Sequence, residues 1–470
     1  MITGTELSNW GLTGPSIKTA LKLLVPNPSG FGSEQIKQHV QDIVATPDQF
    51  TGNSVPWIAS LANAVVAQNK KNENNKIQLT SNACPLTIFG ESIIEAGALE
   101  QINIAASLPI AVRAALAPDA HAGYGLPIGG ILATRNAVIP WAVGVDIGCR
   151  MHMTVFDIPS RLATGMKDKL ANILTDNMVF GAGKDINIKV DHPILHDERY
   201  DLPHIRHLNL RRQAACQIGT SGGGNHFGEF GSVEMEGCSE PMLAFLTHSG
   251  SRGVGYKIAT VYSDLAAKSC SLPDAAKKLA WLSMDADEGK EYWQAMELAG
   301  DFAKACHEII HARIAKALKA GVNMVLQNHH NFAWKEIVDG VESIVHRKGA
   351  TPAGIGVLGV IPGSMTTNTF IVRGKGNPLS ICSSSHGAGR AMSRAAAKQN
   401  FSMSQMRENL ANAGVELVGG SLDECSMAYK DVHAVMEAQR ALVEIVGKFT
   451  PTVVRMAEAE TKPWQKDVGE

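Results

Sequence analysis

The segment VGVDIGCR, residues 143–150, places an aspartate and a cysteine three positions apart, with two glycines close by. Asp146 and Cys149 are both strong metal ligands when they are ionised. The glycines carry no side chain, so the backbone can bend closely around the pair. The preceding apolar run AVIPWAV, 137–143, predicts a buried strand. The segment therefore predicts a strand that delivers two anionic ligands into a tight turn.

The composition is that of a globular protein and gives no sign of a highly charged partner. The chain has 470 residues, 45% of them hydrophobic and 19% charged, and a formal net charge of -2. A nucleic-acid partner cannot be inferred from that charge, so any phosphate-binding surface must be local. The candidates for it are HRKG at 346–349 and the arginines 206, 211 and 212.

The cysteines and the absence of long apolar runs favour a soluble cytoplasmic protein. Eight cysteines are spread along the chain without a CxxC pair, which is typical of a reducing compartment. The first residues lack the basic start and apolar run of a signal peptide. No stretch of eighteen apolar residues predicts a membrane span.

The first 85 residues are polar and loosely patterned. Residues 13–24 and 32–44 predict short helices, because proline or serine stands near the start of each. AQNKKNENNK at 67–76 predicts a charged linker or a solvated helix end. No chemistry-bearing motif occurs here, and residues 1–85 are interpreted as an N-terminal extension of unknown role.

From residue 86 the pattern changes to a mixture of helices and strands. Glycine-rich turns alternate with apolar strands at 86–156 and again at 354–390, with a helical section between them. Residues 279–321 predict two helices, the second ending at Gly321, and 431–449 predict another. The chain is predicted to be α+β, with its functional residues on loops at strand ends.

Five histidines lie in short stretches that contain glycine or asparagine, a context that suggests loops around a site. They are His121, His226, His248, His330 and His386. Together with Asp146 and Cys149 they supply the imidazole, thiolate and carboxylate groups of a transition-metal site. A thiolate has enough lone pairs to bridge two metal ions. Ligand type alone favours zinc over manganese.

Two loops are candidates for binding phosphate. In SSSHGAGR, the serines 383–385 predict the cap of a helix that begins near Gly389, and the amides at such a terminus bind phosphate. His386 is then either a ligand or a nucleophile that attacks phosphorus. The loop IPGSMTTNT at 361–369 offers further amides and hydroxyls.

HEIIH at 307–311 matches the zinc-peptidase pattern HExxH, with its two histidines one turn apart on a predicted helix. The pattern fixes only three positions, and no second motif follows it. An amphipathic helix with two half-buried histidines is the alternative interpretation.

Several motifs together resemble the RtcB RNA ligases. They occur in the family's order between residues 86 and 455 and read PDAHAGYGLPIGG, VGVDIGCRM, GGGNHFGE, HSGSRGVG, HHN, HRKGA, IPGSM, SSHGAGRAMSR and AYKDV. The resemblance implies an RtcB-like fold of layered mixed β-sheets flanked by helices, forming one composite catalytic domain at 86–455. Residues 456–470 would be a C-terminal tail.

The resemblance also implies the reaction. RtcB ligases join RNA ends that carry a 2′,3′-cyclic phosphate or 3′-phosphate to 5′-hydroxyl ends, using GTP and two Mn²⁺ ions. One metal would be held by Asp146, Cys149 and His226, and the other by Cys149, His248 and His330. His330 is preferred to His329 because it directly precedes the asparagine of HHN. His386 would be the nucleophile that carries GMP.

The remaining roles also follow from the resemblance. Asp119 would orient His386, although a turn-capping aspartate is an equal alternative. Asn225 and Arg390 would assist the reaction, and Glu229 would recognise guanine. Arg347 and Lys348 are candidates for RNA or nucleotide contacts, with solvated surface charge the alternative for Lys348. The nucleotide cradle would comprise Asn225, His226, Phe227, Gly228, Glu229, His330, Asn331, Pro362, Gly363, Ser364, Met365, His386, Gly387, Ala388, Gly389 and Tyr429.

Two further cradle residues depart from the family pattern. Thr369 stands where the family usually has a serine, and keeps the hydroxyl. Arg455, in TVVRM, stands where a family lysine contacts the guanine nucleotide. Arginine does not simply replace lysine at a tight contact, which makes nucleotide choice a point to test.

The partners implied by the resemblance are GTP and RNA with the ends described above. An archease-like activator is a further candidate, no membrane is involved, and the expected form is a monomer. Two alternatives stay open: a zinc metallopeptidase at 307–311, and a non-catalytic protein that keeps the metal site and binds RNA without sealing it.

Overall fold

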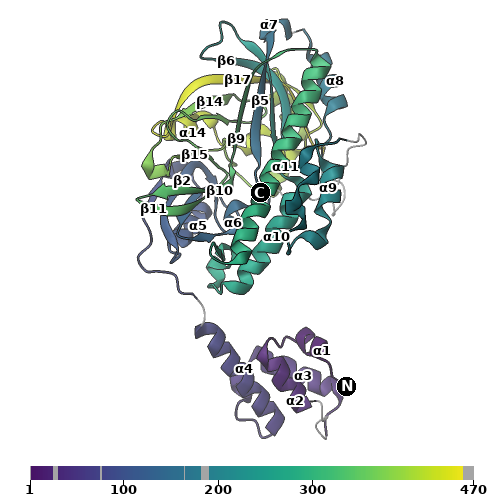
Figure 1. The fold of residues 1–470 in the computed structure, drawn as a ribbon, viewed down its shortest axis with the longest axis vertical. Helices are drawn as coiled ribbons and strands as arrows, with labels where there is room; N and C mark the ends of the chain where they lie inside the picture. Colours follow the sequence, from purple (N-terminus) through teal and green to yellow (C-terminus); the bar gives the residue numbers. More distant parts are fainter. Residues whose placement is uncertain (1, 25–29, 75–76, 164, 181–189, 459–470) are drawn as a thin grey trace. The chain divides into compact units, whose positions relative to one another are not determined.

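The computed structural model describes residues 2–24, 30–74, 77–163, 165–180 and 190–458. The chain divides into two compact units, Met1–Ile77 and Gln78–Glu470. Figure 1 shows the helical unit and the larger mixed unit. Residues 78–85, which we grouped with the N-terminal extension from the sequence, belong to the larger unit.

The small unit is a helical module with a hydrophobic core of its own. Its helices are α1 (Gly4–Asn9), α2 (Pro15–Leu24), α3 (Ser33–Ala45), the 3-10 helix η1 (Pro47–Phe50) and α4 (Pro56–Asn74). The helices predicted at 13–24 and 32–44 are confirmed, and α4 continues into the segment 67–76 that we expected to be a linker or helix end. Leu7, Ile36, Val40, Trp57 and Leu61 are buried together in the core.

The larger unit is built on two main β-sheets. The five-stranded sheet has the order β1 (Leu86–Ile88), β2 (Ala111–His121), β3 (Ile128–Thr134), β11 (Val341–Lys348), β10 (Asn331–Val338). The larger sheet has the order β13 (Leu358–Ile361), β14 (Thr369–Gly374), β17 (Val443–Met456), β6 (Phe227–Met235), β7 (Met242–Ser249), β5 (Arg150–Pro159), β9 (Val322–His329), with β16 (Glu416–Val418) parallel to β17.

Two short ribbons complete the strands. They pair β4 (Ala137–Val138) with β8 (Leu282–Ser283), and β12 (Ala350–Pro352) with β15 (Ser383–Ser385). The α-helices of this unit are α5 (Ala96–Ala106), α6 (Pro140–Val143), α7 (Ser160–Ala163), α8 (Lys167–Asn177), α9 (Leu210–Gln217), α10 (Arg252–Ser269), α11 (Asp287–Leu318), α12 (Arg394–Asn400), α13 (Met403–Asn412) and α14 (Val432–Ala438). Its 3-10 helices are η2 (Glu91–Ile93), η3 (Pro193–His196), η4 (Glu198–Asp201), η5 (Arg206–Leu208), η6 (Asp274–Leu279), η7 (Pro378–Ser380), η8 (Leu422–Glu424) and η9 (Ser426–Ala428).

The long helix α11 packs on one face of the large sheet, beside β5 and β7 (Figure 1). Ile310 and Ile314 of the helix share a buried cluster with Phe156, Phe230 and Phe245 of the sheet. Helices and sheets occur together throughout the larger unit, so the predicted α+β class is confirmed.

The strand predicted at 137–143 is wrong beyond its first two residues. Ala137 and Val138 form β4, after which Pro140 begins the single helical turn α6. Proline has no backbone N–H and cannot continue a hydrogen-bonded ladder, but it fits the first position of a helix. The turn with Asp146 and Cys149 therefore follows a helical turn and leads into β5.

The two helices predicted within 279–321 are one, the 32-residue helix α11. Gly300, near the middle of this helix, serves close packing. A Cβ on Gly148 would lie 2.7 Å from the Cα of Gly300, and a Cβ on Gly300 would lie 2.9 Å from the ring of Phe332. The helix ends at Leu318, with Lys319 in the left-handed conformation.

Two other helix predictions are wrong in part. The helix predicted at 431–449 stops at Ala438, and Val443 begins the longest strand, β17, because valine and isoleucine there pack as a strand between β14 and β6. The serines 383–385 form β15 opposite β12 instead of capping a helix. Helix α12 begins at Arg394, capped by Ser393.

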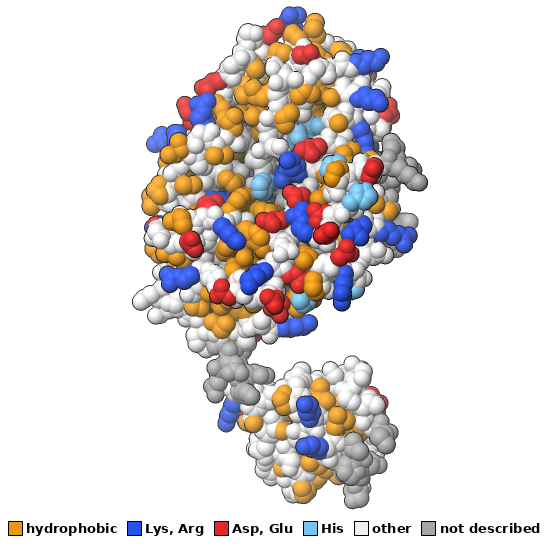
Figure 2. Space-filling model, in the orientation of Figure 1, with side chains coloured by type: hydrophobic (Ala, Val, Ile, Leu, Met, Phe, Trp, Pro, Cys, Tyr) orange, Lys and Arg blue, Asp and Glu red, His pale blue; other side chains and the backbone are white. Residues whose placement is uncertain are grey.

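The surface charge and the character of the helices agree with two expectations from the sequence, a near-zero net charge and no membrane span. Basic and acidic side chains are interspersed on the face drawn in Figure 2. Within the part of the chain that the structure describes, no helix combines the length and apolar character needed to cross a membrane.

Because each unit has a hydrophobic core of its own, we expect the larger unit to fold without the smaller one. A chain that starts at Gln78 should melt at the temperature of the larger unit in the full-length protein, because the small unit's core is formed within its own residues. Differential scanning calorimetry of both chains measures this. A broadened transition, or one shifted to a much lower temperature, would show that the larger unit depends on residues 1–77.

Candidate active site

Four strand ends meet at one edge of the large sheet and carry the predicted metal ligands. Cys149 directly precedes β5, His226 directly precedes β6, and His248 lies near the end of β7. Since Arg150 pairs with Ser249 on one side and with His329 on the other, the antiparallel register brings His248 and His330 to the start of β5. Segments separated by long stretches of sequence thus converge.

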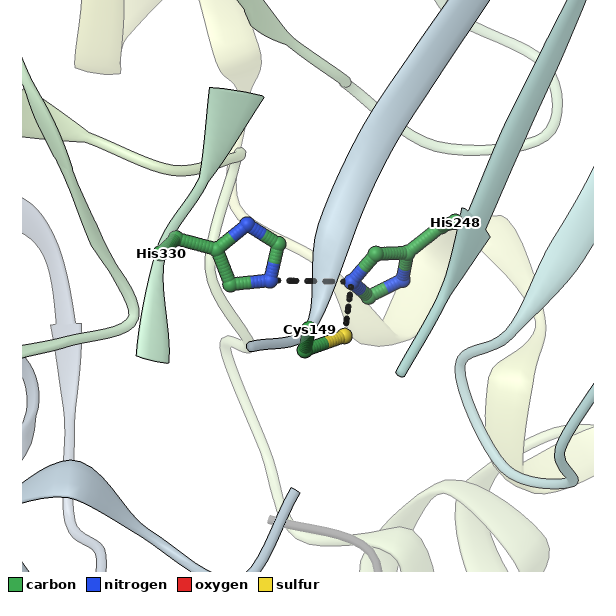
Figure 3. A group of neighbouring side chains, drawn as sticks. All are labelled: Cys149, His248 and His330. Atoms are coloured by element: carbon green, nitrogen blue, oxygen red, sulfur yellow. Dashed lines mark hydrogen bonds between the residues drawn. The ribbon is translucent and has the colours of Figure 1, made fainter. Parts of the chain in front are cut away.

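Cys149 is shared by two groups of ligands. One group contains Asp146, Cys149 and His226, and the other Cys149, His248 and His330, each with its ligand atoms within 4.8 Å of one another. Cys149 Sγ lies 3.6 Å from His226 Nε2 and 3.1 Å from His248 Nε2. His226 Nε2 lies 3.0 Å from Asp146 Oδ2. Figure 3 shows the second group.

The hydrogen bonds around His248 leave its ring ready to bind a cation. Its Nδ1 lies 3.2 Å from the carbonyl oxygen of Asn225, which can only accept, so Nδ1 carries the proton and Nε2 a lone pair. That Nε2 lies 3.1 Å from the Nε2 of His330. Burial, with the nearby His386 and His248, holds the pKa of His330 well below its usual range and keeps the ring neutral. A cation bound between the two Nε2 atoms would be a partner for the lone pair of each.

Asp146 is held in place as an anion. Burial alone would raise the pKa of Asp146, but the charge and hydrogen bond of His226 bring it below its usual value. Its Oδ1 also accepts from the backbone N–H of Ser251 at 3.0 Å. A Cβ on Gly250 would lie 2.0 Å from that oxygen, so only glycine fits there.

The donor set fits a transition metal. A shared thiolate, neutral imidazoles and one carboxylate suit the borderline divalent ions, and by ligand type alone zinc would bind more tightly than manganese. The residues that would hold two ions are the five predicted from the sequence: Asp146, Cys149, His226, His248 and His330.

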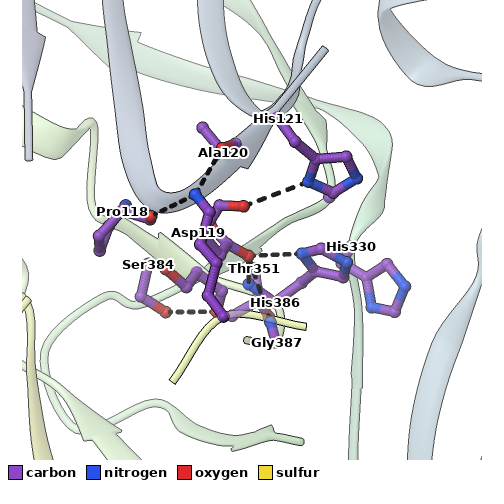
Figure 4. Close-up of polar contacts among 12 residues, drawn as sticks. Pro118, Asp119, Ala120, His121, His330, Thr351, Ser384, His386 and Gly387 are labelled. Atoms are coloured by element: carbon purple, nitrogen blue, oxygen red, sulfur yellow. Dashed lines mark hydrogen bonds and ion pairs between the residues drawn. The ribbon is translucent and has the colours of Figure 1, made fainter. Parts of the chain in front are cut away.

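His386 lies next to this centre, and a buried aspartate fixes its orientation (Figure 4). Oδ2 of Asp119 accepts from His386 Nδ1 at 2.7 Å and from the His386 backbone N–H at 3.1 Å. The proton on Nδ1 leaves Nε2 as the nucleophilic nitrogen of the neutral ring. The ring centroids of His386 and His330 are 4.9 Å apart.

Lys430 holds the backbone on both sides of Asp119. Its Nζ donates to the carbonyl oxygens of Pro118 at 3.1 Å and Ala120 at 2.7 Å, on either side of the aspartate. Burial would raise the pKa of Asp119, yet the hydrogen bond and charge of His386 and the charge of Lys430 keep it below its usual value. The carboxyl is therefore an anion that accepts, as orienting His386 requires.

A pocket with about 830 Å³ of space between protein atoms, counted together with the open solvent at its mouth, lies beside His386. Most of the predicted cradle lines it, namely Asn225, Phe227, Glu229, Pro362, Gly363, Ser364, Met365, Thr369, His386, Gly387, Ala388, Gly389 and Tyr429. Arg390, predicted to assist the reaction, lines it as well.

Five predicted cradle residues lie outside the pocket lining. His226 and His330 belong to the metal-ligand groups, and Gly228 faces Met178. Asn331 is buried, accepting from the backbone N–H of Gly349 at 2.8 Å. Arg455 points away: its neighbours Val454 and Met456 line the pocket, while its guanidinium lies 5.8 Å from the ring centroid of Phe180.

Residues not assigned to the nucleotide cradle from the sequence complete the lining. They are His121 and His248, both already singled out as candidate site histidines, and Arg394, Glu424, Val454 and Met456, which the sequence analysis missed. Strand alternation could have found two of them, because in β17 residues 454 and 456 share the face opposite to that of 455. Arg394 lies within SSHGAGRAMSR, where only the first arginine drew attention.

Glu424 links three other side chains of the pocket. The carboxylate is buried and accepts from Arg390 Nη1 at 2.8 Å, from Arg394 Nε at 2.7 Å and from the hydroxyl of Tyr429. Arg390 also lies 5.3 Å from the centroid of the Tyr429 ring. A buried carboxylate with two guanidinium partners holds both arginines along one wall of the pocket.

Glu229 is the second carboxyl group in the pocket, and its surroundings are very different. Burial raises its pKa to about 8, and no hydrogen bond to its side chain is found among the described residues. A buried carboxyl without a protein partner is costly, which points to a ligand that donates to it.

The positions of Arg347 and Lys348 contradict their predicted role as RNA contacts. Arg347 is fully buried, with Nη1 2.6 Å from Glu336 Oε1 and Nε 2.7 Å from Ser383 Oγ. Lys348 Nζ donates to the carbonyl oxygens of Tyr124 at 2.7 Å and Trp141 at 3.3 Å. Both side chains hold the fold together.

The histidines of HEIIH form a buried hydrogen-bonded chain. The hydroxyl of Thr247 lies 2.7 Å from His307 Nδ1 and 2.8 Å from His311 Nε2. His307 Nε2 donates to the carbonyl oxygen of Ser249 at 3.0 Å, and Thr154 Oγ1 lies 2.7 Å from His311 Nδ1. These contacts satisfy all four ring nitrogens.

His152 completes this cluster, and the three rings lie close enough to hold a cation. Thr247, however, already stands between two of the rings. Glu308, the base that a peptidase would need, is exposed and faces Lys304. The peptidase interpretation has no accessible histidine to support it, and we interpret the cluster as internal packing between α11 and the sheet.

Replacing the shared sulfur should disrupt both ligand groups at once. In Cys149→Ala each group keeps only two ligands, so we expect Mn²⁺ or Zn²⁺ affinity to fall more than about 100-fold, beyond the loss usual for an outer-sphere partner. Isothermal titration and metal analysis measure this, with Cys216→Ala on α9 as the control. Wild-type metal content in Cys149→Ala would rule out the shared-ligand arrangement.

Comparison with known proteins agrees with this geometry. The family model described as tRNA-splicing ligase RtcB matches residues 101–457. RNA-splicing ligase RtcB1 of Escherichia coli strain ATCC 25922 is 34% identical over 402 residues, covering 78% of this chain and 96% of that protein. The tRNA-splicing ligase RtcB of Methanococcus maripaludis is 28% identical over 414 residues, covering 72% and 86%. The resemblance carried by the sequence motifs is confirmed, and this chain belongs to the RtcB family of RNA ligases.

Proposed function

We propose that this chain is a GTP- and manganese-dependent ligase that joins RNA ends with a 3′-phosphate or 2′,3′-cyclic phosphate to 5′-hydroxyl ends. The observation that carries the proposal is His386. Its Nδ1 is held by the buried Asp119, and its ring lies between the pocket and the ligand groups that share Cys149.

In the first step, Nε2 of His386 attacks the α-phosphorus of GTP. A phosphorus–nitrogen bond forms, the bond to the β-phosphate oxygen breaks, and pyrophosphate leaves. Asp119 accepts from Nδ1–H throughout, which stabilises the positive charge that the ring gains during attack.

The RNA then takes the nucleotide from the histidine. An oxygen of the RNA 3′-phosphate attacks the same phosphorus and breaks the phosphorus–nitrogen bond, which leaves an activated diphosphate end. The 5′-hydroxyl of the second RNA attacks the terminal RNA phosphorus, and GMP leaves. A cyclic phosphate is first opened by water.

The five ligand residues would hold the metal ions, and Arg390 and Arg394 would face the phosphates. Bound Mn²⁺ supplies charge neutralisation on phosphate oxygens, as in other phosphoryl transfers. Asn225 has two roles. It lines the pocket, and its backbone carbonyl oxygen fixes the tautomer of His248.

Glu229 would select guanine. An ionised carboxylate accepts from both N1–H and the 2-amino group of guanine, a pair of donors that adenine lacks. Met365, Val454 and Met456 supply apolar walls for the base. Arg455 would not take part, because its guanidinium lies near Phe180 outside the pocket lining.

Guanylylation of His386 is the direct test. Incubation with Mn²⁺ and α-labelled GTP should leave acid-labile label on the wild-type chain, and His386→Ala should remove it, because that variant lacks the ring nitrogen oriented by the Asp119 carboxylate. His433→Ala, a histidine exposed on α14, is the matched control and should label normally.

The same experiment separates the proposal from a metal-containing protein that only binds RNA. Such a protein would bind RNA but acquire no label with any of the four nucleoside triphosphates. Label retained by His386→Ala would remove the proposed nucleophile.

Glu229 should make GTP binding depend on pH. Because the carboxyl is protonated below its pKa of about 8 and must ionise to accept from guanine, GTP affinity should rise by about tenfold per pH unit from pH 6 towards 8. Glu229→Gln should lose this dependence and bind GTP and ATP more equally. Equilibrium binding at several pH values measures both effects.

The free protein gives an independent readout. A carboxyl whose pKa is raised on folding costs stability between its ordinary value of 4.5 and about 8, so the melting temperature should fall across this window as pH rises. Glu229→Gln should flatten the fall. Parallel pH profiles for the two proteins would mean that Glu229 is not the buried titrating group.

A further inference from the structure

A second cavity lies at the far end of the loop that follows β2. It encloses about 490 Å³ of space between protein atoms, and its lining includes Gly123, Tyr124 and Gly125 of the loop, with Lys277 and Lys278 of η6 opposite. A Cβ on Gly125, whose φ is +79°, would lie 2.9 Å from the carbonyl oxygen of Lys278. The loop therefore needs glycine to approach η6 this closely.

Tyr124 and Lys278 of this lining lie close to a second aromatic ring, that of Trp141. Tyr124 is 52% exposed, and its ring centroid lies 5.9 Å from that of Trp141. Lys278 Nζ lies 3.8 Å from the Tyr124 centroid and 5.5 Å from that of Trp141. A large aromatic ring left half in water, with its position fixed by a cation, is unusual for a side chain that only packs.

The cavity is tied to the active site through the same loop. His121, three residues before Tyr124, lines the pocket beside His386. Lys348 Nζ holds the backbone carbonyls of Tyr124 and Trp141. The next residue, Gly349, packs on the nucleophile, since a Cβ there would lie 3.1 Å from His386 Cε1. Tyr124 is thus held in a fixed relation to the reacting group.

We propose that Tyr124, with Lys277 and Lys278, binds the single-stranded RNA segment next to the phosphate end that is to be sealed. This inference rests on the proposed RNA-joining function. A base would stack on the Tyr124 ring and the backbone phosphates would lie along the two lysines, the combination that binds single strands without regard to sequence.

The chemistry of the lining favours RNA over a peptide. Two lysines face a single acidic residue, Asp274, among the residues that line the cavity. The aromatic ring offers a flat face suited to a base, and the loop that carries it begins directly after His121, which lines the pocket beside His386. A second nucleotide cofactor is less suitable, because no arginine is among the residues that line the cavity.

The test compares Tyr124→Ala with the wild type in two assays. Fluorescence anisotropy with a single-stranded oligonucleotide ending in a 3′-phosphate should show about tenfold weaker binding, the loss typical of one stacked base. Labelling by α-labelled GTP should be unchanged, because that step needs no RNA. Tyr124→Phe should bind RNA normally, and Tyr256→Ala, at another exposed tyrosine, is the matched control.

The outcomes separate this inference from the function on which it rests. If the wild-type chain binds the oligonucleotide but is never labelled, the guanylylation proposal fails while the Tyr124 comparison still stands. Wild-type RNA affinity in Tyr124→Ala, or an equal loss in Tyr256→Ala, overturns the stacking site. Loss of GTP labelling in a folded Tyr124→Ala also overturns it, because the residue would then serve the nucleotide.

Discussion

The position of one sulfur atom constrains the rest of the larger unit. Cys149 must reach Asp146 and His226 on one side and His248 and His330 on the other, and these residues come from four different strand ends. A sheet in which β5 lies between β7 and β9, with β6 next to β7, delivers all of them to one end of the sheet. The close contact of Gly148 with Gly300 then seats the metal-binding turn against α11. The strand order and the glycine pair together place the shared ligand.

The larger unit buries charged side chains at the positions where the proposed chemistry needs a fixed geometry. Removing a carboxylate from water costs several kcal/mol, and Asp119 is fully buried. Its bonds to the His386 ring and backbone, together with the charge of Lys430, offset that cost and leave the imidazole with one orientation. Glu424 acts similarly on Arg390 and Arg394. Glu229 has no such partner, and this contrast distinguishes a carboxyl that holds protein groups from one that awaits a ligand.

Local sequence gave the ligand types and most of the pocket, but not the backbone that carries them. The spacing in VGVDIGCR and the glycine-flanked histidines indicated a metal centre, and motif resemblance assigned each ligand to its group. Periodicity failed where packing outweighed it: the two helices expected within 279–321 are one helix that contacts the metal-binding turn at Gly300, and the apolar spacing of 431–449 continues from α14 into β17. Burial of Arg347 could not be foreseen either, because Glu336 and Ser383, its partners, are brought to it only by sheet pairing.

A near-neutral chain can act on RNA if recognition is concentrated at the reacting end. Long-range attraction of a polyanion needs a broad basic surface, and the face in Figure 2 has charges of both signs. Direct ligation of a terminal phosphate needs less: cations at the phosphorus, two oriented arginines, and a surface that holds the adjoining base. Stacking on one exposed ring contributes about 1–3 kcal/mol irrespective of base identity, whereas hydrogen bonds to base edges would restrict the substrates. An enzyme that sealed ends of varied sequence would therefore be better served by the proposed stacking on Tyr124 than by a base-reading groove, and in our proposal Glu229 reserves base recognition for the nucleotide alone.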